Sequence, residues 1–209
     1  MKVRSAISAA LTMILAVGAV FANADQAAPA AAAPQSALTT ESTSVKEMKS
    51  ILFKLVRQDE YLDEAIDTLD SANGKLSIHD ISALGLSLKM IKGNLDVISA
   101  LNKKQFTEVQ PDPALNTYSK TIFSYSRQVS QKVLKVTGLV AEIALKNKKS
   151  AMRDAVSSKK GKKTRNGKKL IQILEGQKAM DQLSADIKTL KTSSSKLTAT
   201  SKWLYIVSK

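Results

Sequence analysis

The chain has 209 residues, no cysteine, one histidine and a formal net charge of +14. These numbers exclude a disulfide framework, a zinc site with cysteine ligands, a thiol nucleophile and a haem-attachment motif. The charge is uneven, because residues 25–100 hold 11 acids against 7 bases, whereas residues 101–209 hold 7 acids against 23 bases. A strongly basic half indicates a polyanionic partner or surface, although the charge can also serve solubility alone.

Residues 1–24 have the pattern of a secretory signal peptide. Lys2 and Arg4 precede an apolar run over residues 6–21, and Ala22-Asn23-Ala24 has the small residues of a cleavage site. The run is shorter than the ~20 apolar residues that span a bilayer, which argues against a membrane anchor. We therefore expect a secreted or periplasmic protein.

Residues 25–43 are rich in Ala, Pro, Ser and Thr and have no apolar periodicity. Such a segment cannot bury a face, so we expect a disordered spacer. Residues 44–209 remain for the folded part, and this length is ordinary for one domain.

The first two predicted helices cover about residues 45–69 and 78–101. Apolar residues recur every three or four positions in both segments, which places them on one face of a helix. Asp59 interrupts the first stripe, and we expect it at the edge of the stripe. Asn73-Gly74 is a good helix stop, and Ser77 with Asp80 suits a capping box, so a short antiparallel hairpin is expected.

The third predicted helix runs from Pro113 to about Leu145, after a break at Pro111 and Pro113. The fourth runs from about residue 169 to 194 and can extend to Leu197. The tail at 203–207 either alternates like a strand, extends the last helix or packs across the bundle end. Four stripes that must be buried predict an all-α fold, an antiparallel four-helix bundle with long amphipathic helices.

A basic flexible connection is expected at 147–168, between the third and fourth helices. The bases of this tract are Lys146, Lys148, Lys149, Arg153, Lys159, Lys160, Lys162, Lys163, Arg165, Lys168 and Lys169. They predict binding of an anionic polymer or surface: lipopolysaccharide, teichoic acid, glycosaminoglycan, extracellular DNA or anionic lipid. The tract has no aromatic residue for base stacking. The alternatives are a solvated loop without a partner and a nuclear-localisation-like address in a host-directed effector.

The segment from Leu62 to Leu88 resembles a degenerate EF-hand. The resemblance implies a calcium site with oxygen ligands from Asp70, Asn73, Ser77 and Asp80. The loop is one residue shorter than the usual twelve, its last ligand is Asp in place of Glu, and no second copy is found. A helix stop, a turn and a helix start explain the same residues without a metal.

An acidic face marks the first predicted helix. Its members are Asp59, Glu60, Asp63, Glu64, Asp67 and Asp70. We expect it to meet bases of the third or fourth helix or of another copy, and the second case predicts a self-assembling structural protein or homo-oligomer. No Glu-x-x-His motif suggests a metal centre within a bundle.

We expect no catalytic residue, no cofactor and no small-molecule substrate. His79 has no partner that the sequence identifies, and the hydroxyl groups lack an activating base. The sequence thus favours an exported, non-enzymatic helical protein that binds a polyanionic partner through residues 146–169.

Overall fold

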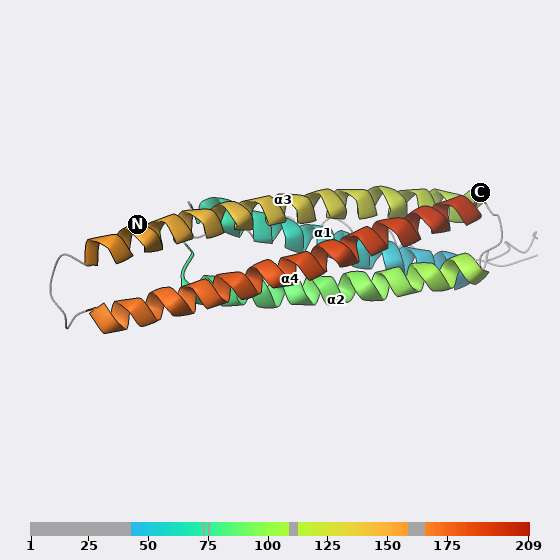
Figure 1. Cartoon of the computed structure of the whole chain (residues 1–209). Helices are drawn as coiled ribbons and strands as arrows, with labels where there is room; N and C mark the ends of the chain where they lie inside the picture. The colour runs from blue at the N-terminus through green and yellow to red at the C-terminus, as the bar shows by residue number, and fades with distance from the viewer. Residues whose placement is uncertain (1–42, 73, 75, 109–112, 159–165) are drawn as a thin grey trace, which may run out of the picture. The chain divides into compact units, whose positions relative to one another are not determined.

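The computed structural model describes residues 43–108, 113–158 and 166–209, apart from residues 73 and 75. The predicted signal peptide and all of the predicted spacer except Thr43 lie outside the described residues. The described chain forms four helices, α1 (Thr43–Ser71), α2 (Ile78–Glu108), α3 (Pro113–Ser158) and α4 (Asn166–Val207), shown in Figure 1. The all-helical, four-helix fold is therefore confirmed.

The helices pack as a ring in which α1 contacts α2, α2 contacts α4, α4 contacts α3, and α3 contacts α1. Helices consecutive in the chain run in opposite directions (Figure 1). The lateral pairs α1–α3 and α2–α4 are therefore parallel, and α2 and α3 lie diagonally across the bundle.

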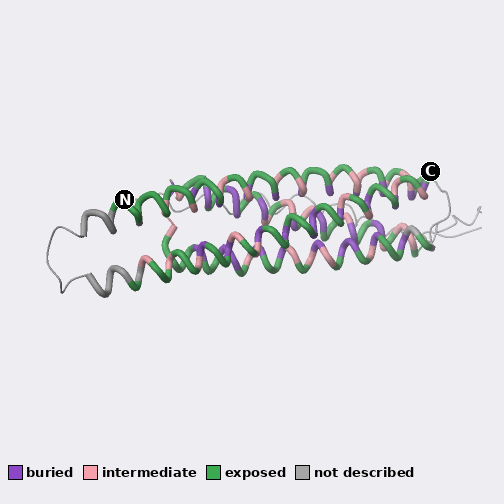
Figure 2. The backbone as a smooth tube through the Cα atoms, in the orientation of Figure 1, coloured by how far each residue is buried: buried purple, intermediate pink, exposed green. Residues whose placement is uncertain are grey.

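The apolar stripes face one another along the bundle axis (Figure 2). All six α2 residues of the predicted stripe, from Ile81 to Ile98, are buried. Fully burying each Leu or Ile side chain contributes about 1.5–3 kcal/mol, so these stripes supply the main driving force for the fold. The tail at 203–207 extends α4 and buries Leu204, so it is helical and not a strand.

The core becomes polar at the end where α1 and α3 begin and α2 and α4 end. Asn102 donates from Nδ2 to Ser201 Oγ at 2.9 Å, and Ser119 shares a hydrogen bond with Ser208. Ser194 and Ser208 also donate to backbone carbonyls one turn earlier in α4. These hydroxyls thus satisfy their hydrogen bonds inside the core, and their small size lets the helices approach.

Gln58 is the buried polar residue of α1, and the side chain of its neighbour Asp59 is largely but not fully buried. Gln58 is 4% exposed, and its Oε1 accepts a hydrogen bond from Asn94 Nδ2 of α2 at 3.1 Å. Asp59 lies at the edge of the stripe, with its side chain 17% exposed, as expected from the cost of burying an unpaired carboxylate.

The α3–α4 pair is longer than the α1–α2 pair, with 46 and 42 residues against 29 and 31. The predicted connection at 147–168 is shorter in the structure, because α3 continues to Ser158 and α4 begins at Asn166. One end of the α3–α4 pair therefore extends past the turn between α1 and α2 (Figure 1).

Candidate functional site

The α1–α2 turn marks where the four-helix part of the molecule ends. Gly74 has a φ of 80°, and the Lys146 Cδ of α3 lies 2.7 Å from where a Cβ on residue 74 would stand. On the other side, Ile78 at the start of α2 lies 4.0 Å from the corresponding position at Gly176 of α4. Residues 147–158 of α3 and 166–175 of α4 therefore project beyond the turn. We call these two segments, together with Leu145 and Lys146 at their base, the tip.

The structure brings both ends of the predicted polyanion site to this tip. Lys148, Lys149 and Arg153 are exposed on the last turns of α3, and Lys146 is exposed at its base. Lys168 and Lys169 belong to the first turns of α4. The remaining predicted members, Lys159, Lys160, Lys162, Lys163 and Arg165, lie outside the described residues.

Charge at the base of the tip is partly balanced within α3. Lys146 Nζ lies 2.6 Å from Glu142 Oε1, and both side chains are more than half exposed. Such an exposed pair is weak and screened by salt, so it leaves Lys146 available to compete for an external anion. The sequence contains two acids between residues 147 and 175, Asp154 and Glu175, so the tip is strongly basic.

The acidic face of α1 meets bases of α3, as one of the two sequence hypotheses expected. Lys132 Nζ lies 2.7 Å from Asp59 Oδ2 and 2.6 Å from Asp63 Oδ2, and Lys135 Nζ lies 3.2 Å from Asp70 Oδ2. Burial of Lys132 opposes its charged form, but the hydrogen bonds and charges of the two carboxylates outweigh it and raise the Lys132 pKa. These contacts attach α1 to α3 on the body of the bundle, away from the tip.

The EF-hand-like loop has both of its end carboxylates engaged in protein contacts. Ser77 N and Oγ donate to Asp80 Oδ2 at 3.1 and 2.6 Å, and Asp80 N donates to Ser77 Oγ at 3.1 Å. This reciprocal pair is the expected capping box, and its hydrogen bonds lower the Asp80 pKa. Asp70 pairs with Lys135, and Asn73 lies outside the described residues. Calcium binding stays a prediction, because the described loop contacts are those of a helix start.

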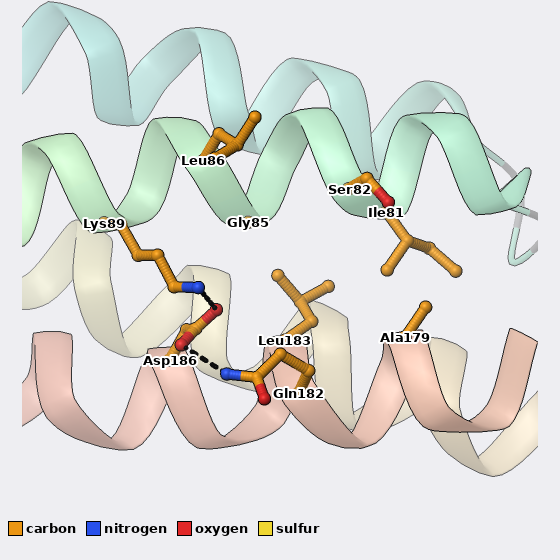
Figure 3. A pocket seen from close by; sticks show the side chains of 9 residues that line it. All are labelled: Ile81, Ser82, Gly85, Leu86, Lys89, Ala179, Gln182, Leu183 and Asp186. Atoms are coloured by element: carbon orange, nitrogen blue, oxygen red, sulfur yellow. Dashed lines mark hydrogen bonds and ion pairs between the residues drawn. The ribbon is translucent and has the colours of Figure 1, made fainter. Parts of the chain in front are cut away.

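A groove between α2 and α4 forms a hollow of about 270 Å³ (Figure 3). Ile81 and Leu183 supply apolar walls, and Asp186 faces it with its side chain only 11% exposed. Both oxygens of this carboxylate are engaged, one 3.4 Å from Lys89 Nζ and the other by Gln182 Nε2 at 2.9 Å (Figure 3). The polar groups of the groove thus bind one another and join α2 to α4.

Farther along the same groove, a second hollow is lined by Lys92, Asp96, Ser193 and Lys196. The hydrogen bond from Lys92 lowers the Asp96 pKa against the opposing effect of burial, and Ser193 and the charge of Lys196 act in the same direction as Lys92. This second carboxylate is therefore held ionised by its neighbouring groups.

Among the residues that the structure describes, no three acidic or histidine side chains gather into a group that could hold a metal. His79 is exposed in the first turn of α2, as expected.

None of the described helices combines the length and apolar character required to cross a bilayer. Comparison of the chain with protein-family models, curated proteins and solved structures finds no match.

Large apolar side chains lie beside the basic residues of the tip, and the sequence pattern did not single them out. Leu145 and Met152 on α3, and Ile171 and Leu174 on α4, are each 50–60% exposed. The signal was present in the seven-residue spacing of Leu145 and Met152, which puts both on a face opposite the buried stripe.

Proposed function

We propose that this protein is an exported, non-enzymatic helical-bundle protein whose tip binds a polyanionic partner or surface. The observation that carries this proposal is the projection of the basic ends of α3 and α4 beyond the α1–α2 turn. Export follows from the predicted signal peptide, and the partner would then be one of the anionic polymers or surfaces outside the cytoplasm.

A projecting basic segment binds anions better than the same charges spread over a bundle. Closely spaced ammonium groups create a high local potential, and binding of a polyanion releases its condensed counterions. On the body of the bundle, three of the six carboxylates of the acidic α1 face pair with Lys132 and Lys135. The tip extends past the end of α1 at Ser71, so its positive charge lies beyond that acidic helix.

Retention on a heparin column tests the proposal with two variants of equal charge. The tip variant changes six lysines to glutamine: Lys148 and Lys149 of α3, and Lys159, Lys160, Lys162 and Lys163 of the segment that connects the two halves of the tip in the sequence. The body variant makes the same change at six other positions, Lys46, Lys54, Lys103, Lys120, Lys188 and Lys191, all exposed. We expect the tip variant to elute at much lower salt than the body variant. Equal elution of the two variants would show that net charge, and not the tip, determines retention.

Self-assembly is a second candidate, favoured by an apolar stripe on the outer face of α2. Leu86, Met90 and Val97 are 69%, 49% and 53% exposed, and their spacing places them on one face. An exposed stripe of this kind is a typical homo-oligomer contact. Light scattering that reports only monomer at high concentration would count against it, and Leu86→Gln with Met90→Gln should dissociate any oligomer that does form.

A further inference from the structure

The tip carries exposed apolar side chains as well as positive charge. Leu145 and Met152 are 60% and 58% exposed, and Ile171 and Leu174 are 55% and 50% exposed. Single exposed apolar residues are ordinary on any protein surface. Here, however, four large ones gather at one end of the molecule, on the two helices that also carry the basic tract.

On α3 these residues form a continuous face. Gly138, Ala141, Leu145 and Met152 follow one another at helical spacing, and all four are exposed. They lie on the side of α3 opposite the buried Val136, Val140 and Ile143. Near the tip, the side of α3 that faces away from the bundle core is thus apolar.

Basic side chains border this apolar face. Lys148 and Lys149 lie between Leu145 and Met152 in the sequence, and Arg153 follows directly. All three are exposed. A helix surface with an apolar centre and lysine or arginine flanks is the arrangement that lies in the headgroup region of an anionic bilayer. The long lysine stems keep their ammonium groups in water while their methylenes cover apolar surface.

We propose that the tip docks on an anionic lipid bilayer, with Leu145 and Met152 of α3 entering the boundary between headgroups and acyl chains. This inference rests on the proposed function and names its partner. A soluble polyanion, such as a sulfated polysaccharide, is bound through charge. The exposed apolar side chains add nothing to its affinity. A lipid surface uses both features, because the headgroups bind the lysines and the interior accepts the apolar side chains.

The experiment separates the apolar contribution from the charge. The bundle forms a compact unit from Thr40 to Lys209, so every protein comprises residues 25–209, which keeps the apolar run at 6–21 from binding lipid. The apolar tip variant is Leu145→Gln with Met152→Gln. Its matched control is Phe53→Gln on α1 with Ile206→Gln near the end of α4, two exposed apolar residues that lie away from the tip and outside the α2 stripe. Both pairs lie on the surface, so a thermal melt should show that both variants fold.

Each protein is sedimented with vesicles of phosphatidylglycerol and phosphatidylcholine in equal parts, and passed over heparin. We expect the apolar tip variant to bind the vesicles at least about tenfold more weakly than wild type and to keep its heparin retention. The control with Phe53 and Ile206 replaced should match wild type in both assays, and vesicles of phosphatidylcholine alone should bind poorly.

Vesicle binding by the apolar tip variant equal to that of wild type would overturn the lipid inference and leave polyanion binding intact. Failure of wild type to bind anionic vesicles, together with retention on heparin, would do the same and indicate a soluble polymer as the partner. Failure of the proposed function is recognised separately, by a six-lysine tip variant that keeps its heparin retention.

Discussion

The side chain of Lys146 lies directly on Gly74, joining the α1–α2 turn to the outer part of α3. Its Cδ is 2.7 Å from where a Cβ on residue 74 would stand, and Gly74 itself has a φ of 80°. This contact closes the four-helix part of the molecule. Beyond it, only α3 and α4 continue, so the contact marks the point past which their basic residues project.

Replacement of Gly74→Ala should destabilise the bundle by about 1–2 kcal/mol. The added Cβ meets Lys146, and a left-handed backbone is unfavourable for alanine. Gly93→Ala is the matched control, because a Cβ at this exposed helical position meets nothing within 4 Å. That control should instead gain up to about 1 kcal/mol from helix propensity. Urea melts of the two variants shifting in the same direction would contradict this account of the turn.

Replacement of Lys132→Met should cost about 1–3 kcal/mol, because it leaves the largely buried Asp59 carboxylate without its ammonium partner. Lys135→Met is the control and should cost well below about 1 kcal/mol, since its pair with Asp70 is about half exposed. The raised Lys132 pKa means that this stabilisation is complete below the ordinary lysine value of 10.5 and is lost as pH rises through the raised value. Denaturation at pH 7 therefore measures it in full, and equal losses in the two variants would refute the distinction.

Replacement of Asp96→Asn should reduce stability at pH 7 by less than about 1 kcal/mol, because the side chain is 35% exposed and screened by solvent. The Asp96 pKa is lowered from 3.8, so its contribution is present above pH 3.8 and is lost as pH falls through the lowered value. The difference between wild type and Asp96→Asn should accordingly shrink below about pH 4 in a series of melts. A difference that grows on acidification would contradict the pKa direction.

The hydrogen bond between Asn102 and Ser201 should appear as a coupling energy of roughly 1 kcal/mol in a double-mutant cycle. The cycle uses Asn102→Ala, Ser201→Ala and the double variant, because both residues are fully buried and the bond links α2 to α4. Strictly additive losses would show that the two side chains do not depend on each other in the folded protein.

Helical periodicity predicted the four helices correctly because the apolar stripe of each helix is buried against the other helices. It missed the polar layers for a physical reason. Ser194, Ser201 and Ser208 follow Ile187 at seven-residue intervals and continue its buried face, but a pattern based on hydrophobicity does not register serine. In the same way Gln58, and not Asp59, is the buried polar residue of α1.

The position of the tip could not be read from the sequence. The apolar stripe of α3 ends near Ile143, so the sequence indicated a connection after that point. The following residues include Ala144, Leu145, Lys146, Lys148 and Lys149, which are good helix formers. The helix therefore continues to Ser158, past the turn that joins α1 and α2. The length of the projection is measured from the α1–α2 turn, and the sequence of α3 alone does not reveal that Gly74 lies beside Lys146.

Site-specific labelling tests most directly that the tip is the part that meets a polyanion. The absence of cysteine permits a single label at Ser150→Cys in the tip or at Thr117→Cys near the opposite end of α3, both exposed. On addition of heparin at low salt, an environment-sensitive fluorophore at position 150 should change its emission and return to the starting value at high salt, while the label at 117 should stay constant. A response at 117 with none at 150 would contradict the account.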